Sequence, residues 1–297
     1  MQIVIAGASG FIGSEVVDRA LKMGHQVFAL LRDQSPTPFD VDALKEGRLV
    51  CLPLGADPEI LAQGFGLGPG AQWILAAGLN RGMDPGVLER GHVSLTQDLV
   101  ASAEALEAER VVLLSCLGAG SGGHWAASKR AAEGCVRGSS RPWAVVRSAP
   151  VFGIGDALLD DVGAWMHRSP FIPRFLEEVE LQPLHVGDVA EALLIPLEGD
   201  LQIGGDLLSW GDLLQACAKA AGKSLMGPQL SSATQAWLAK TFGDRGWLAD
   251  LVPFDTEAWL RHRGGYTLES NALPRLLGRA PRLVADYLQF EWAYRAK

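Results

Sequence analysis

Long apolar runs, cysteine pairs and basic residues are all scarce in this chain of 297 residues. No apolar run reaches the roughly 18 to 20 residues that a membrane-spanning helix needs, so membrane insertion is not expected. No signal peptide is visible, because the first apolar run leads directly into a glycine-rich turn. The cysteines, Cys51, Cys116, Cys135 and Cys217, are scattered without a Cys-x-x-Cys pair, so we expect no metal site and a cytoplasmic location.

The charge balance is acidic. Lysine and arginine number 26 against 34 aspartates and glutamates, which gives a net charge of −8. Phosphate contacts need local positive charge, so a nucleic-acid partner is not expected. Hydrophobic residues make up 48% of the chain, a globular composition, and the length allows a large domain with a smaller lobe.

The most informative stretch is a glycine-spaced turn near the N-terminus. An apolar run at residues 2–6 precedes Gly7-Ala8-Ser9-Gly10-Phe11-Ile12-Gly13, and an amphipathic segment follows at 14–21. Gly7 permits a tight exit from a buried strand, Gly10 leaves room for a pyrophosphate beside the backbone, and Gly13 lets the helix approach the sheet closely. The helix N-terminus then attracts the anion. This context predicts a dinucleotide site; the alternative is an ordinary tight turn without a ligand.

Strand-like and helix-like stretches alternate through the first half of the chain. This rhythm predicts an α/β fold with a doubly wound, Rossmann-type parallel sheet. We expect residues 1–155 to form the dinucleotide-binding domain, with 181–198 returning to it, and 156–297 to form a smaller C-terminal lobe on the substrate side. The expected strands are 26–31, 48–54, 72–76, 110–114 and 143–146, and the expected helices are 93–109, 125–136, 212–221 (capping box at Ser209) and one from Ser270 to Gly278.

Four further motifs follow the glycine turn along the chain: Ser-Cys-Leu-Gly-Ala at 115–119, Ser-Lys-Arg-Ala-Ala-Glu at 128–133, Val-Arg-Ser-Ala-Pro-Val-Phe-Gly-Ile-Gly-Asp at 146–156 and Pro-Leu-His-Val-Gly-Asp-Val-Ala-Glu-Ala at 183–192. Together with the glycine turn, their order resembles the short-chain dehydrogenase/reductase superfamily, in its extended and atypical branches. Within it, the motif at 115–119 is most similar to the atypical, epimerase-like group related to the NDUFA-nine accessory subunit of respiratory complex I.

The resemblance implies a catalytic serine, tyrosine and lysine, but the tyrosine position holds Trp125, four residues before Lys129. The indole N–H of tryptophan donates a hydrogen bond but does not ionise near neutral pH, so the general acid/base that the tyrosine would provide is missing. His124 is a candidate replacement, although it points about 100° away around the helix; a surface or capping role is the alternative. Ser115 is the candidate serine, with Cys116 as the alternative, and Lys129 is also implied to hold the nicotinamide ribose.

Most of the expected cofactor residues lie directly after the ends of the predicted strands. Arg32 after the second strand suits the 2′-phosphate of NADP(H), whereas the adjacent Asp33 suits NAD(H). NADP(H) is therefore favoured and NAD(H) is possible. Besides the glycine turn and Lys129, the resemblance implies contacts from residues after strands three, four and six, namely Asp57, Ala76, Ala77, Gly78, Pro150 and Val151.

The substrate side is less defined by the sequence. An apolar and aromatic lining is expected from Trp125, Phe152, Trp165 and Met166, although such residues more often belong to the core. Four cationic side chains are candidates for holding an anionic group, but nothing in the sequence brings them together: Arg147, Arg168, Arg174 and His185.

Two functions remain open. The first is a non-classical or weak oxidoreductase acting on a small or lipophilic carbonyl or alkene. The second is a catalytically inactive, cofactor-binding structural or regulatory subunit, as the complex I resemblance implies. The partner is accordingly a small-molecule substrate or a larger protein complex, and a monomer and a homodimer both remain possible. An RNA-binding role is disfavoured by the acidic balance.

Overall fold

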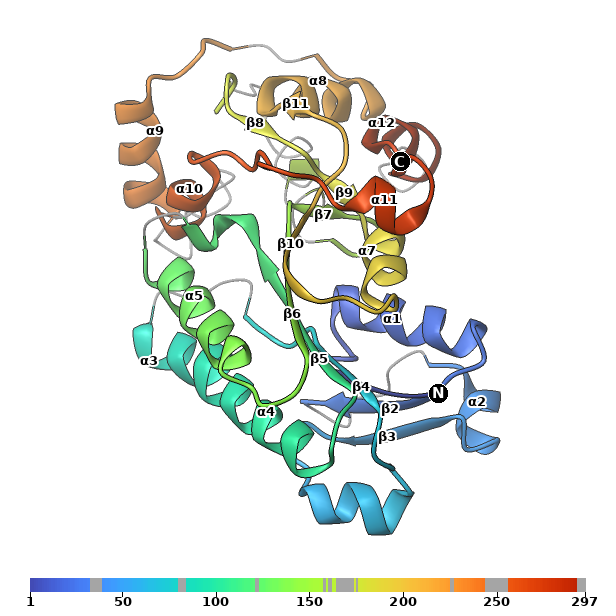
Figure 1. Cartoon of the computed structure of the whole chain (residues 1–297). Coiled ribbons are helices and arrows are strands. Elements are labelled where there is room, and N and C mark those ends of the chain that lie inside the picture. The colour runs from blue at the N-terminus through green and yellow to red at the C-terminus, as the bar shows by residue number, and fades with distance from the viewer. Residues whose placement is uncertain are drawn as a thin grey trace.

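A seven-stranded sheet, parallel throughout, forms the centre of the computed structural model (Figure 1). The structure describes residues 1–32, 39–79, 84–120, 123–156, 159, 162–163, 174, 176–224, 227–243 and 256–292. Across the sheet the order is β10 (Gly199–Ile203), β6 (Trp143–Ser148), β5 (Arg110–Cys116), β4 (Gln72–Leu75), β1 (Gln2–Ala6), β2 (Gln26–Leu31) and β3 (Leu49–Pro53). The expected Rossmann-type α/β fold is confirmed, and the five further strands expected in the first half all form.

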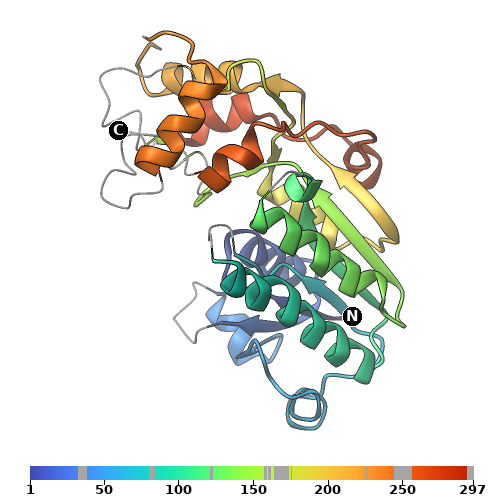
Figure 2. The same ribbon diagram turned by 90° about the vertical axis from the view of Figure 1, so that its left-hand side faces the viewer.

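Alternation along each strand divides the core between the two faces of the sheet. Ile3 and Ile5 belong to one apolar cluster, whereas Val4 and Ala6 belong to the other, and all four are fully buried. Successive side chains of a strand point to opposite faces, so apolar residues fill both faces of the sheet, as a parallel sheet requires. One face is covered by α1 (Phe11–Lys22) with α7 (Val186–Leu193), and the other by α4 (Leu95–Ala105) with α5 (His124–Arg137), which lie in front of the sheet in Figure 2.

The helix expected over 93–109 is shorter and begins differently. It is α4, which continues from a π-helical segment, η2 (Glu89–Ser94), and from the short α3 (Pro85–Leu88). The π-helix has no signature in the apolar spacing, and such segments are frequent at functional sites.

The remaining elements form a lobe above the carboxyl ends of the strands. They include β8 (Glu180–Leu181) paired with β11 (Leu208–Ser209), then α8 (Trp210–Ala220), α9 (Ser232–Leu238), α10 (Thr256–His262), α11 (Leu273–Leu277) and α12 (Val284–Tyr287). The capping box is confirmed, because the Ser209 hydroxyl accepts from the Asp212 N–H and the Asp212 carboxylate accepts from the Ser209 N–H. None of the described helices is long and apolar enough to cross a membrane.

Two details of the second half differ from expectation. The segment 181–198, expected to return to the dinucleotide-binding domain, contains β9 (Leu184–His185) and α7, but β9 pairs with β7 (Val151–Phe152) and not with the large sheet. The strand that joins the large sheet is β10, which was not among the expected strands. The domain boundaries themselves stay a prediction.

The second difference is the cap of the last expected helix. Its cap is not Ser270: α11 begins at Leu273, whose N–H is accepted by the Asn271 side chain. Gly278, with φ +65°, ends the helix in the left-handed region as expected.

Candidate functional site

The carboxyl ends of the parallel strands meet at the same edge of the sheet, and most of the expected cofactor residues follow those ends. The glycine turn follows β1, Arg32 follows β2, and Asp57 lies beyond β3. Residues 76–79 follow β4, and Pro150 lies beyond β6. The fold therefore brings these separate segments to one edge, beneath the C-terminal lobe (Figure 1).

The glycine turn is built from close backbone contacts. Gly7 has φ +82°, and a Cβ there would lie 2.7 Å from the Cα of Ala77. A Cβ on Gly13 would lie 2.1 Å from the carbonyl oxygen of Gly7. Neither position tolerates a side chain, because the obstacle in each case is backbone. The spacing of these glycines is thus required by the approach of α1 to the turn and of the turn to the segment after β4.

The N-terminus of α1 is suited to an anion. Its cap residue, Gly10, provides no side-chain hydrogen bond, and the first turn contains no acidic residue. Backbone N–H groups at such a terminus, together with the helix dipole, attract a phosphate. Gly7, Ala8 and Gly10 already donate their N–H groups to backbone carbonyls, so it is the first turn of α1, from Phe11 to Gly13, that fits a dinucleotide pyrophosphate.

The other expected cofactor residues lie around this turn. Ala76 donates its N–H to the Ala6 carbonyl at 3.0 Å, which fixes the wall of small residues beside β1. Arg32 is exposed at the tip of β2, and Asp33 lies outside the described residues. Asp57 is exposed and accepts from the Glu59 N–H at 2.7 Å. The Pro150 carbonyl accepts from Leu184 at 3.0 Å, which links the end of β6 to β9.

Lys129 lies beside the wall after β4. A Cβ on Gly78 would be 3.0 Å from the Lys129 ammonium nitrogen. The ammonium also lies over the Trp125 ring, 5.8 Å from its centre. Trp125 is buried, and its indole N–H donates to the Leu79 carbonyl at 2.8 Å. Lys129 thus borders the segment after β4, and the indole N–H of Trp125 is held by the backbone carbonyl of Leu79.

Sequence reasoning missed His92, which completes this cluster. It lies in η2, is 2% exposed, and contacts Ser128 through Nδ1 at 2.8 Å. Leu79 donates its N–H to the other ring nitrogen at 2.9 Å. Burial, and secondarily the charge of Lys129, lower the pKa of His92 from 6.5 to about 4. Near neutral pH His92 is therefore an uncharged side chain; no motif in a single sequence marks it.

Ser115 and Cys116 point to different surroundings. The Ser115 hydroxyl donates to the buried Glu133 carboxylate at 2.7 Å. Cys116 instead packs with the apolar group around Trp125, which includes Leu79 and Leu88. Of the two candidates for the serine position, Cys116 is therefore the one on the Trp125 side of the sheet edge.

Glu133 is the centre of a buried ionic cluster. Arg147 donates two hydrogen bonds to it, at 2.8 and 2.5 Å, and Arg137 donates a third at 3.0 Å. Burial works to raise the pKa of Glu133, but the hydrogen bonds from Arg147 and Ser115 outweigh it and hold that pKa below its ordinary value. Arg147 is consequently committed to the fold, and this cluster holds α5 against β5 and β6.

His124 is the first residue of α5 and is exposed. Trp125, the next residue, is buried against the segment after β4. The structure thus brings Lys129 and Trp125 together at the sheet edge, whereas His124 lies on the exposed start of the helix.

The expected substrate-side residues do not converge. Phe152 is buried and stacks edge-on with His185 at 5.4 Å between ring centres, and His185 caps α7 by accepting from the Gly187 N–H. Trp165, Met166 and Arg168 lie outside the described residues. Arg174 pairs with Glu177 at 2.8 Å. Among the described residues, the expected cationic side chains therefore form no common anion site.

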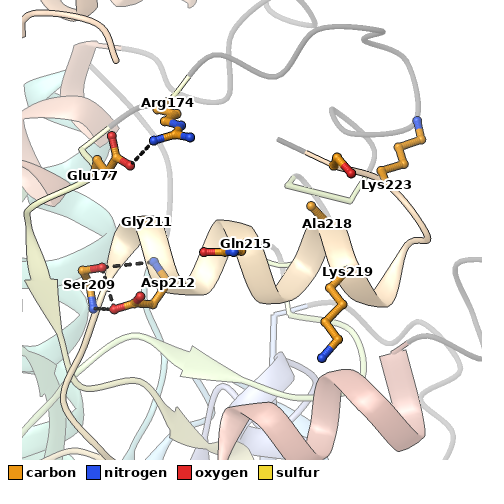
Figure 3. A pocket seen from close by; sticks show the side chains of 10 residues that line it. Arg174, Glu177, Ser209, Gly211, Asp212, Gln215, Ala218, Lys219 and Lys223 are labelled. Carbon is orange, nitrogen blue, oxygen red and sulfur yellow. Dashed lines mark hydrogen bonds and ion pairs between the residues drawn. The ribbon is translucent and has the colours of Figure 1, made fainter. Parts of the chain in front are cut away.

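A separate cavity of about 500 Å³ lies along α8 (Figure 3). Arg174 and Glu177 face each other at one end, near the Ser209–Asp212 capping box, and Lys219 and Lys223 lie toward the other end. The cavity is polar and shares no residue with the sheet edge. It belongs to the outer surface of the C-terminal lobe and not to the candidate cofactor site.

Comparison with known proteins agrees with this geometry. A family model described as NAD(P)H-binding matches residues 7–151. The ceramide reductase of Caulobacter vibrioides (strain NA1000 / CB15N) is 30% identical over 233 residues, which cover 74% of this chain and 70% of the relative.

Solved structures with the same fold include two epimerases. The UDP-glucose 4-epimerase of Thermotoga maritima is 17% identical, with a TM-score of 0.70 over 99% of both chains. The UDP-glucuronic acid 4-epimerase of Bacillus cereus, in complex with UDP-glucuronic acid and NAD, is 17% identical, with a TM-score of 0.71 over 99% of this chain and 98% of that one.

Proposed function

The chain belongs to the NAD(P)H-binding, epimerase-like family of short-chain dehydrogenases/reductases, and we propose that it is a non-classical reductase of a lipophilic carbonyl or alkene. The observation that carries the proposal is the position of the Lys129 ammonium, which lies beside Gly78, in the segment after β4 that approaches the glycine turn, and over the ring of the buried Trp125. A charged donor beside an apolar surface suits a substrate with one polar reacting group and a hydrocarbon body.

NADPH is the cofactor we propose. The glycine turn at 7–13 would hold its pyrophosphate, and the exposed guanidinium of Arg32 would pair with its 2′-phosphate. The small residues at 76–78 would allow close approach beside β1. Bound there, NADPH supplies a hydride; the protein supplies binding, orientation and the proton.

Proton donation is the step at which the residues of this chain differ from the family pattern. Reduction of a carbonyl carbon by hydride leaves an oxygen that must gain a proton. Trp125 cannot provide it, because its indole N–H is held by the Leu79 carbonyl and does not titrate usefully. The Lys129 ammonium is the donor we propose, with His124 or water as the alternative sources. Because the usual phenol is replaced, we expect turnover to be slow.

The substrate class is supported by two observations. The Lys129 ammonium lies over Trp125, which belongs to a buried apolar group with Leu88 and Ala126, with Leu79 and Cys116 packed against it. In addition, the curated relative that is 30% identical is a ceramide reductase. We therefore favour a long-chain, lipid-like carbonyl compound over a small polar one.

The test of this function is NADPH oxidation with a panel of carbonyl and alkene compounds that differ in chain length. Turnover should rise with chain length, and Lys129→Met should lower kcat at least about 100-fold. Lys45→Met, on the exposed α2 (Val41–Lys45), is the matched control and should leave turnover unchanged. A panel without any turnover, or a Lys129→Met protein as active as wild type, would contradict the proposal.

The cofactor preference has its own experiment. Titration should give tighter binding of NADPH than of NADH, and Arg32→Ala should weaken NADPH binding about tenfold while it leaves NADH binding unchanged. Equal affinities in the wild type would remove the role given to Arg32.

The second candidate function is a catalytically inactive, cofactor-binding subunit of a larger assembly. It is favoured by the indole of Trp125 at the tyrosine position, whose donor is committed to the backbone. In that case the protein should co-purify with a large complex from its native source. A free monomer or homodimer there would count against this alternative.

A further inference from the structure

His92 connects two segments that the catalytic proposal depends on. Through Nε2 it accepts from the backbone N–H of Leu79, in the turn after β4, at 2.9 Å. Through Nδ1 it contacts the Ser128 hydroxyl of α5 at 2.8 Å. Its own backbone lies in the π-helical η2, where the Thr96 hydroxyl donates to its carbonyl. Three separate elements are therefore joined through this imidazole.

The hydrogen bonds define which nitrogen carries the proton. With the proton on Nδ1, the ring donates to Ser128, the Ser128 hydroxyl donates to the Trp125 carbonyl at 2.8 Å, and Nε2 accepts from Leu79. With the proton on Nε2, the ring would donate to the Leu79 carbonyl at 3.1 Å, an oxygen that already accepts from Trp125, and the Leu79 N–H would lose its acceptor. The first arrangement satisfies every donor in the cluster, so it is the one we assign.

Lys129 shares a boundary with this imidazole. A Cβ on Gly78 would lie 3.0 Å from the Lys129 nitrogen and 3.4 Å from Nε2 of His92. Gly78 follows Ala77, which in turn contacts Gly7 of the cofactor turn. Any movement of the turn after β4 relative to α5 would therefore displace the ammonium from the cofactor edge.

We propose that His92 is a positioning residue for Lys129: it ties the Gly78–Leu79 turn to α5, so that the ammonium is held beside Gly78, in the segment that also approaches the cofactor turn. The inference rests on the proposed function for the role of Lys129. An uncharged ring suits this position, because it accepts from Leu79 without repelling the ammonium. Trp125 reinforces the tie by donating to the Leu79 carbonyl.

The experiment is a double-mutant cycle read as binding of NADP⁺, or of NAD⁺ if that binds more tightly, by calorimetry. His92→Leu removes the acceptor for Leu79 and should raise the dissociation constant about fivefold, as for loss of one hydrogen-bonded contact. His92→Gln, which keeps an amide acceptor, should stay within about twofold of wild type. In a Lys129→Ala background, His92→Leu should add no further loss, since it acts through Lys129.

Ser128→Ala is the second variant. It removes the hydrogen-bond partner of His92 Nδ1, and alanine is a good helix former at that position of α5. It should weaken binding in the wild-type background and not in the Lys129→Ala background. His25→Leu is the matched control: His25 precedes β2, at the opposite edge of the sheet, and its replacement should leave binding unchanged.

The inference is overturned if the effects of these variants on binding simply add to the effect of Lys129→Ala. If His92→Leu and Ser128→Ala weaken binding equally with and without Lys129, their role is general to the fold. The same holds if neither variant changes binding. This outcome is separable from that of the proposed function, because the cycle uses no turnover: a protein that reduces nothing can still show the coupling, and an active reductase can lack it.

Discussion

Acidification should destabilise this protein through His92 at a pH where its carboxylates are still ionised. The ring is neutral in the folded chain, where its pKa is lowered from 6.5 to about 4. Between those two pH values the unfolded chain binds a proton that the folded chain does not, so the free energy of unfolding falls as the pH falls. The stabilisation that comes from keeping His92 neutral is thus fully present above pH 6.5.

The size of this effect follows from the two pKa values. Each pH unit below 6.5 removes about 1.4 kcal/mol, so the loss at pH 5 is about 2 kcal/mol and its limit below pH 4 is about 3 kcal/mol. The depressed pKa of Glu133 contributes stability above about pH 4.5, which is lost only at lower pH. The interval from pH 7 to pH 5 therefore reports mainly on histidine.

The assay is urea unfolding of the wild type and His92→Gln at pH 7 and pH 5. The glutamine cannot titrate, so the difference in unfolding free energy between the two proteins should change by about 2 kcal/mol between the two pH values. His25→Gln is the control for a second histidine with a lowered pKa. A difference that stays constant within about 0.5 kcal/mol would refute a neutral, buried His92.

Three further outcomes are expected. Gly13→Ala should lower the free energy of unfolding by about 2 kcal/mol, because its Cβ would lie 2.1 Å from the Gly7 carbonyl oxygen, and calorimetry should detect no dinucleotide binding. Gly134→Ala is the control: it lies on the exposed face of α5 with open space around it, so it should be neutral or stabilising. Glu133→Gln should cost about 3 kcal/mol in urea unfolding, since it leaves Arg147 and Ser115 without a buried carboxylate, and an unchanged midpoint would contradict that account. Trp125→Tyr should raise kcat about 100-fold by supplying a phenol one turn from Lys129, whereas Trp125→Phe should not; equal rates for the two variants would show that the site is not arranged for acid catalysis.

Much of the fold could be predicted from local patterns. Short, nearly continuous apolar runs indicated the strands of the first half, because most of these strands are buried on both faces of the sheet. The glycine turn was also predictable, since a Cβ at Gly7 or Gly13 is excluded by backbone that lies within the turn or one strand away.

The parts that escaped prediction depend on distant partners. Strand β10 pairs with β6 from more than fifty residues away, and nothing in its sequence Gly-Asp-Leu-Gln-Ile announces that pairing. Ser115 and Cys116 are neighbours with similar side chains, and only the packing of α5 against the end of β5 decides that Ser115 meets Glu133 and Cys116 meets the group around Trp125.

The sequence by itself determined that a strand, a glycine turn and a helix would form a dinucleotide cradle, and that Trp125 stands one helical turn before Lys129. Both follow from spacing along one short segment. Only the tertiary structure decided that His92 joins that pair, because its partners Leu79 and Ser128 come from two other segments of the chain. A hydrogen-bonded cluster assembled across three elements has no local period, so it became visible only once the chain was folded.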